Sequence, residues 1–196
     1  MAAAMGLKDP YTQAHAQRVS TYSRRLALRL GLSQGEAELI ALGGLLHDVG
    51  KLALSDRIFS NQKAELSSEL IWEVKIHPVL GAAMLKRLDC PATICDVALC
   101  HHERIDGSGY PFGLKGESIP LSARIVSVAD CFDAITTDRP YQKRQSCNEA
   151  VIALSEMAGR CLSEGLVALF VDDIRRNGMV HEHAGGRSGL EASLPN

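Results

Sequence analysis

Histidines and aspartates inside apolar segments are the feature that most restricts how this chain of 196 residues can fold. Five of its seven histidines, and two aspartates, lie in or at the ends of apolar segments with helical spacing: His15, His47, His77, His101, His102, Asp48 and Asp130. A single histidine on an apolar stripe is usually a hydrogen-bonded core residue. A carboxylate in such a segment needs a compensating partner, because burying an unpaired charge is costly. Seven such groups predict a fold that gathers them around a shared partner.

A pair of divalent metal ions would provide that partner for all seven groups. Mixed imidazole and carboxylate ligation favours iron, manganese or zinc, whereas all-oxygen ligation would favour magnesium or calcium. Seven ligands are more than one metal needs, so the sequence predicts two metals with Asp48 as the bridging ligand. Taken alone, the pair His47-Asp48 would favour a helix-end histidine beside a solvated aspartate, and it is the other five residues that favour a metal site.

The apolar run over residues 39–46 leads directly into His47-Asp48, and Gly50 and Lys51 follow. We expect Gly50 to end the helix in a left-handed conformation. Lys51 adds a positive charge beside the pair, where it could meet an anionic substrate. Two adjacent metals activate a bridging hydroxide and hold a phosphoryl group, so Lys51 and Arg104 are predicted to neutralise phosphate charge. The alternative for Arg104 is an exposed loop arginine.

The spacing of apolar residues predicts an all-α fold, a single-domain bundle of about seven helices over residues 1–178. Aromatic residues are only 5% of the chain, so the core is aliphatic. Ser33, with Glu36 three residues later, predicts a capping box, and Ser146 predicts the start of another helix. The segment 103–113, with three glycines and a proline, predicts an ordered loop. Residues 179–196, with His181 and His183, are predicted to be a flexible, solvated tail.

Charge and composition exclude several classes of partner. The formal net charge is −2, which favours neither a nucleic acid polymer nor an anionic membrane surface. No apolar run reaches the roughly 18 residues of a membrane-spanning helix, and no signal peptide is recognisable. The six cysteines lack the spacing of a zinc ribbon, which indicates reduced thiols. We therefore expect a cytoplasmic protein without membrane insertion.

The chain resembles the HD-GYP family, a branch of the HD-domain metal-dependent phosphohydrolases, from about residue 9 to residue 170. The resemblance rests on an ordered series of segments: Asp9-Pro10-Tyr11-Thr12, His15, Arg18-Val19, Leu46-His47-Asp48-Val49-Gly50-Lys51, His77-Pro78, His101-His102-Glu103-Arg104, Asp106-Gly107-Ser108-Gly109-Tyr110-Pro111, Ile119-Pro120-Leu121, Val128-Ala129-Asp130 and Thr137-Asp138-Arg139-Pro140-Tyr141.

This resemblance implies a helical phosphodiesterase that hydrolyses cyclic di-GMP to pGpG or GMP through a metal-bound hydroxide. It implies seven metal ligands: His15, His47, Asp48, His77, His101, His102 and Asp130. It also implies that Asp48 and Lys51 act in catalysis, that Lys51 and Arg104 contact substrate, and that Gly109, Tyr110 and Pro111 shape the mouth of the site. Iron or manganese is the expected metal, with zinc, nickel or magnesium as alternatives.

Three departures from the family pattern bear on this expectation. Tyr11 stands where some members carry a glutamate that holds a third metal, so we expect two metals. Residues 60–65 lack a common Lys-Pro-Gly run. Gln142 replaces a basic residue, which leaves Lys143 as the candidate phosphate contact.

Two alternatives to a cyclic di-GMP phosphodiesterase stay open: a metal-retaining cyclic dinucleotide-binding module with little turnover, and a hydrolase of 3′,3′-cyclic GMP-AMP. An upstream sensory domain, a diguanylate cyclase-type protein and a second copy of the chain are the partners considered.

Overall fold

A computed structural model describes residues 10–54, 68–138 and 143–179 of the chain. These residues form eight α-helices and two short 3-10 helices and contain no β-strand, which confirms the all-α prediction. In chain order they are α2 (Pro10–Arg29), α3 (Gln34–Leu46), η1 (Val49–Ala53), α5 (Ser68–Lys75), α6 (His77–Arg87), α7 (Ala92–Cys100), η2 (Gly116–Ser118), α8 (Leu121–Thr136), α9 (Cys147–Met157) and α10 (Glu164–Asn177).

Helix ends follow the signals in the sequence. Ser33 accepts a hydrogen bond from the backbone amide of Glu36, and the Glu36 carboxylate accepts one from Ser33, so the predicted capping box is confirmed. Ser146 and Glu149 form the same arrangement at the start of α9. Gly31 follows α2 with φ 91°, a left-handed conformation that suits glycine.

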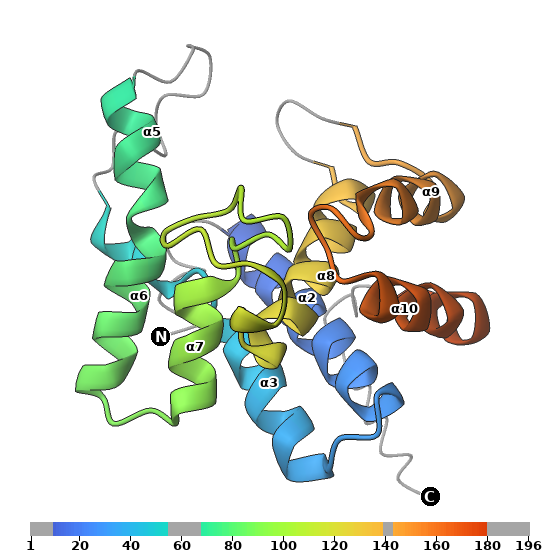
Figure 1. Cartoon of the computed structure of the whole chain (residues 1–196), viewed down its shortest axis with the longest axis horizontal. Helices are drawn as coiled ribbons and strands as arrows, with labels where there is room; N and C mark the ends of the chain where they lie inside the picture. Colours follow the sequence, from blue (N-terminus) through green and yellow to red (C-terminus); the bar gives the residue numbers. More distant parts are fainter. Residues whose placement is uncertain (1–9, 55–67, 139–142, 180–196) are drawn as a thin grey trace, which may run out of the picture.

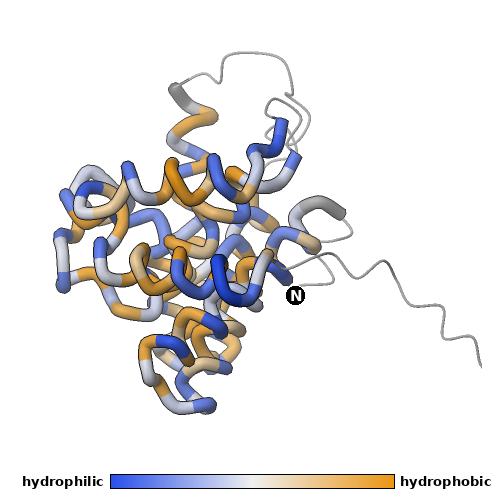
Figure 2. Tube along the Cα trace, turned by 90° about the vertical axis from the view of Figure 1, so that its right-hand side faces the viewer, coloured by the Kyte–Doolittle hydropathy of each residue, from blue (hydrophilic) through white to orange (hydrophobic). Residues whose placement is uncertain are grey.

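The larger core surrounds α2, which packs against α3, α8 and α10 (Figure 1). Tyr22, Phe132 and Phe170 meet edge to face there, with ring centroids 5.1 to 5.7 Å apart. A smaller cluster that includes Leu85 and Ile94 joins the end of α3 and η1 to α6 and α7. Figure 2 shows hydrophobic and hydrophilic residues interleaved along the helical turns, as expected for amphipathic helices that share a core.

Gly50 lies inside η1, so the prediction that it ends a helix in a left-handed conformation is wrong. A Cβ atom at Gly50 would lie 1.9 Å from the carbonyl oxygen of His77 and 2.6 Å from the amide nitrogen of Gly81. Glycine is needed here because the backbones of η1 and α6 touch. This contact brings Asp48 close to His77.

Several expectations fall on residues outside the described part of the chain. These are the expectations for residues 60–65, for Gln142 and for the tail with His181 and His183. Tyr11 lies in α2, but its side chain is not described. Helix α10 ends at Asn177, but the predicted division into a domain and a tail stays a prediction. Among the described residues, no helix is both long and apolar enough to cross a membrane. All six cysteines are described, and all are free thiols.

Candidate metal centre

Asp48 lies at the centre of a cluster of histidines between α3 and η1. Its carboxylate is buried, with 4% of the residue exposed. Oδ2 of Asp48 lies 3.3 Å from Nε2 of His47, and Oδ1 lies 3.2 Å from Nε2 of His77 and 3.8 Å from Nε2 of His101. Nε2 of His77 is itself 3.3 Å from Nε2 of His101. Three imidazoles, at the C-terminal ends of α3 and α7 and at the start of α6, therefore converge on one carboxylate.

The other ring nitrogen of each of these histidines is held by a backbone carbonyl. Nδ1 of His47 donates to the carbonyl oxygen of Gly44 over 2.7 Å, and Nδ1 of His77 donates to that of Val74 over 2.6 Å. Nδ1 of His101 donates to the carbonyl oxygen of Ala98 over 3.0 Å. Metal-binding histidines are fixed in this way, because a donor bond from one nitrogen sets the tautomer and turns the other lone pair toward the metal. In the neutral form of each ring, this tautomer leaves a lone pair and no proton on Nε2.

The arrangement fits metal ions, because lone pairs of Asp48, His77 and His101 otherwise face one another. Oδ1 of Asp48 is buried without a hydrogen-bond partner. Two groups of ligand atoms have all their members within 4.8 Å of one another: Asp48 with His77, His101 and His102, and Asp48 with His15 and His47. Asp48 belongs to both groups, which is the arrangement expected of a carboxylate shared by two metals.

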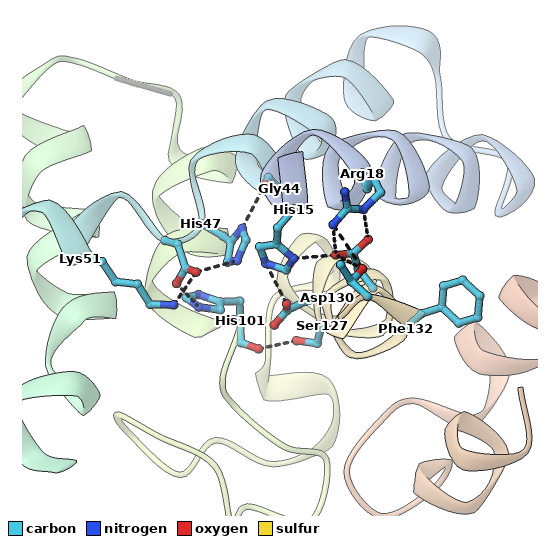
Figure 3. A network of polar contacts seen from close by, with 12 residues as sticks. His15, Arg18, Gly44, His47, Lys51, His101, Ser127, Asp130 and Phe132 are labelled. Carbon is cyan, nitrogen blue, oxygen red and sulfur yellow. Dashed lines mark hydrogen bonds and ion pairs between the residues drawn. The ribbon is translucent and has the colours of Figure 1, made fainter. Parts of the chain in front are cut away.

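His15 joins the cluster from α2 and lies between two aspartates of α8, Asp130 and Asp133. Figure 3 shows His15 beside Asp130. Nε2 of His15 lies 3.3 Å from Oδ1 of Asp130, and its Nδ1 donates to Oδ2 of Asp133 at 2.8 Å. Arg18 donates from Nε to Oδ1 of Asp133 at 2.6 Å. Asp133 thus orients His15 as the carbonyls orient the other rings. Asp133 was not predicted from the sequence, although it follows Asp130 by three residues, the same spacing as that of Arg18 after His15.

The charges around the cluster set the protonation states of its members. Burial opposes ionisation of Asp48, but the nearby Lys51 and His47 hold its pKa well below the usual value. Burial lowers the pKa of His102 to about 4, and burial with the neighbouring His102 and His47 lowers that of His101. At neutral pH the carboxylate is charged and these two rings are neutral, the states that metal ligands require.

His15 differs, because two carboxylates outweigh its burial. Burial would lower the pKa of this ring, but hydrogen bonds to Asp130 and Asp133 raise it to about 9. Burial opposes ionisation of Asp130, but the hydrogen bond to His15 and the nearby ring of His47 lower its pKa.

The loop after α7 lies against the cluster through Tyr110. Its ring stacks on His102, with centroids 4.7 Å apart and planes 25° apart, and its amide donates to the carbonyl of His102 at 3.2 Å. A Cβ atom at Gly109 would lie 2.4 Å from the amide nitrogen of Arg104, so only glycine allows this approach. Pro111 follows Tyr110 through a cis peptide bond. The predicted segment Gly109-Tyr110-Pro111 is therefore brought beside a candidate ligand, His102.

Glu103 fixes this loop and was missed in the sequence analysis. Its carboxylate is buried, with 3% of the residue exposed, and accepts hydrogen bonds from the amides of Phe112 at 2.7 Å and Leu114 at 2.9 Å. Glu103 directly follows His101-His102. The only signal available was a carboxylate beside two candidate ligands.

The three predicted basic contacts are placed differently. Nζ of Lys51 lies 2.6 Å from Oδ2 of Asp48, at the edge of the cluster (Figure 3). Arg104 is exposed at the start of the loop. Lys143 is exposed in the segment between α8 and α9, and no described contact links it to the cluster. Their roles toward a substrate stay predictions.

Comparison with known proteins agrees with this geometry. The model of the HD domain family matches residues 1–163. This chain belongs to the HD domain family. A cyclic di-GMP phosphodiesterase of Pseudomonas aeruginosa, PA4108, is 45% identical over 154 residues, which cover 77% of this chain and 36% of that protein. The 3′3′-cGAMP-specific phosphodiesterase 3 of Vibrio cholerae is 35% identical over 150 residues, which cover 76% of this chain and 32% of that protein.

A solved structure of a related protein has a similar fold. Bd1817, described as a HDG"Y"P protein from Bdellovibrio bacteriovorus, superposes with a TM-score of 0.64 at 28% identity, covering 82% of this chain and 51% of that chain. These matches confirm the resemblance to HD-GYP proteins. This HD domain spans 36% to 52% of the length of the curated relatives first matched.

Proposed function

We propose that this HD domain is a metal-dependent phosphodiesterase that hydrolyses cyclic di-GMP to pGpG or GMP. The observation that carries the proposal is the set of inward-facing Nε2 lone pairs around the shared carboxylate of Asp48. A pair of divalent metals, when bound, would supply an activated water and neutralise charge on a phosphodiester. The cyclic di-GMP specificity is proposed from the 45% identical relative of Pseudomonas aeruginosa.

We assign roles to the chain's own residues as parts of this proposal. His47, His77, His101, His102, His15, Asp48 and Asp130 would hold two metals, with Asp48 bridging. Lys51 would keep Asp48 ionised and meet the phosphate, and Arg104 would bind substrate at the rim. Iron or manganese is the metal proposed, because imidazole with carboxylate suits both. A reducing cytoplasm is the proposed location, where six free thiols would persist.

The direct test is product analysis. Protein purified without air and loaded with manganese or ferrous iron is incubated with cyclic di-GMP, and the products are separated by chromatography. The proposal predicts pGpG, followed by GMP if the second bond is also cut. Metal-loaded protein that forms neither product would refute the phosphodiesterase and leave the alternative of a binding module with little turnover.

A second substrate is considered because the Vibrio cholerae relative is specific for 3′3′-cGAMP. Its identity to this chain is lower, at 35% against 45%, so cyclic di-GMP is preferred. Rates measured side by side on the two cyclic dinucleotides decide the point, and a higher kcat/KM for 3′3′-cGAMP would reverse the preference.

A further inference from the structure

A cation on α5 lies against the loop that contacts the candidate metal centre. Nζ of Lys75, in the last turn of α5, is 5.6 Å from the centroid of the Tyr110 ring, a cation–π distance. The Tyr110 ring in turn stacks on His102. Two ring contacts therefore place an ammonium group at the rim of the candidate metal centre. Lys75 is exposed, so its charge is also available to a ligand in solution.

Trp72 lies on the same side of α5 as Lys75. The two residues are three apart in a helix, a spacing that puts side chains on one face. Trp72 is 67% exposed, which is unusual for so large an apolar side chain. It is the single tryptophan of the chain. The face of α5 that meets Tyr110 thus carries an exposed aromatic ring one turn beyond the cation.

We propose that Lys75 and Trp72 form a second wall of the substrate site, where Lys75 binds the phosphate that is not being cut and Trp72 stacks on a base. A cyclic dinucleotide has two phosphates and two bases, and a metal pair holds one phosphate. The other half of the ligand needs a cation and a flat apolar surface nearby. Base stacking on exposed aromatic side chains beside a basic residue is a common way to bind such ligands. The inference rests on the proposed function.

Tyr110 has a defined part in this arrangement. Its amide bond to the carbonyl of His102 and its ring stack on the same residue fix its position relative to a metal ligand. Lys75 lies over that ring, so its ammonium group is held beside the candidate metal centre, where the second phosphate of a bound cyclic dinucleotide could reach it.

The test compares two substrates on manganese-loaded protein: cyclic di-GMP, and bis(p-nitrophenyl) phosphate, which has one phosphate and no base. In Lys75→Met and Trp72→Ala we expect KM for cyclic di-GMP to rise about 5- to 100-fold. Trp72→Phe, which keeps a ring, should show a smaller rise. Hydrolysis of bis(p-nitrophenyl) phosphate should stay within about twofold of wild type, because the metal centre is untouched.

Matched controls are Lys86→Met, which removes the same charge at the far end of α6, and Leu88→Ala, which removes an exposed apolar side chain. Both should keep the wild-type KM. Fluorescence of wild-type Trp72 provides a measurement without mutation, and a phosphorothioate analogue of cyclic di-GMP should quench it.

Three outcomes would overturn the inference. One is an unchanged KM in both variants together with no quenching. Another is an equal loss on both substrates, which would mean that α5 only supports the metal centre. The third is wild-type protein that cuts bis(p-nitrophenyl) phosphate but not cyclic di-GMP, which would refute the proposed function itself and the inference with it.

Discussion

Nδ1 of His15 donates a hydrogen bond to Oδ2 of Asp133 over 2.8 Å, and Arg18 holds the same carboxylate from the other side. This contact turns Nε2 of His15 toward Asp130 and the cluster. It links α2 to α8 through two residues that are 118 positions apart in the sequence.

Replacing Asp133 by Asn should weaken metal binding without removing a ligand. An amide cannot balance the charges of Arg18 and His15, and loss of such an orienting partner lowers metal affinity about 10- to 100-fold. Competition between the protein and a fluorescent chelator for manganese measures the change.

Asp173→Asn is the matched control. Asp173 is also buried, on α10, and its carboxylate pairs with Arg25 of α2 at 2.6 Å. Its substitution should lower stability while leaving manganese affinity within about twofold, because Asp173 contacts no candidate ligand. Equal losses of affinity in both variants would show that Asp133 acts only through stability.

Glu103→Gln should release the loop after α7. A glutamine has one acceptor oxygen, so one of the amides of Phe112 and Leu114 loses its partner. We expect a loss of about 1.5 to 3 kcal/mol in the free energy of unfolding, measured with urea, and faster hydrogen exchange at these two amides. The exposed Glu117→Gln should change stability by less than about 0.5 kcal/mol. Unchanged exchange in Glu103→Gln would contradict the anchoring role.

Gly50→Ala should destabilise the protein by about 1 to 3 kcal/mol, because the new Cβ atom would overlap the carbonyl of His77. Gly35→Ala, inside α3 with no atom within 4 Å of the added Cβ, should instead raise stability by up to about 1 kcal/mol. Thermal unfolding of both variants tests the pair. A Gly50→Ala protein as stable as wild type would mean that η1 does not need its contact with α6.

Removal of metal should lower the melting temperature. A ligand that binds only the folded state at about 100 times its Kd stabilises it by about 2.7 kcal/mol, which corresponds to roughly 5 to 10 °C for a domain of this size. Scanning calorimetry with manganese and with a chelator measures this difference. Identical melting curves with manganese and with chelator, at a manganese concentration far above the Kd found by competition, would argue against a site preformed in the folded protein.

The helices could be predicted from the sequence because their signals are local. Ser33 with Glu36 and the glycine at position 31 need only a few neighbouring residues to act. The candidate ligands could be predicted because imidazoles and carboxylates in apolar segments need a partner.

The residues that support the ligands could not be identified in the same way. Asp133 acts through side chains of a distant helix and Glu103 through backbone amides of a loop, whereas a carboxylate in a helix or loop is ordinarily solvated. Gly50 was recognised as special but for the wrong reason, because only the packing of η1 on α6 reveals the crowding at its Cβ position.

The shared role of Asp48 is the central claim, and the metal content of Asp48→Asn tests it most directly. Elemental analysis of wild-type and variant protein, both loaded with manganese and both shown to be folded by circular dichroism, gives the number of metals per chain. We predict two metals in the wild type and loss of both in the variant, because both ligand groups depend on this carboxylate. Retention of two metals by Asp48→Asn would contradict the bridging role and with it the proposed metal centre.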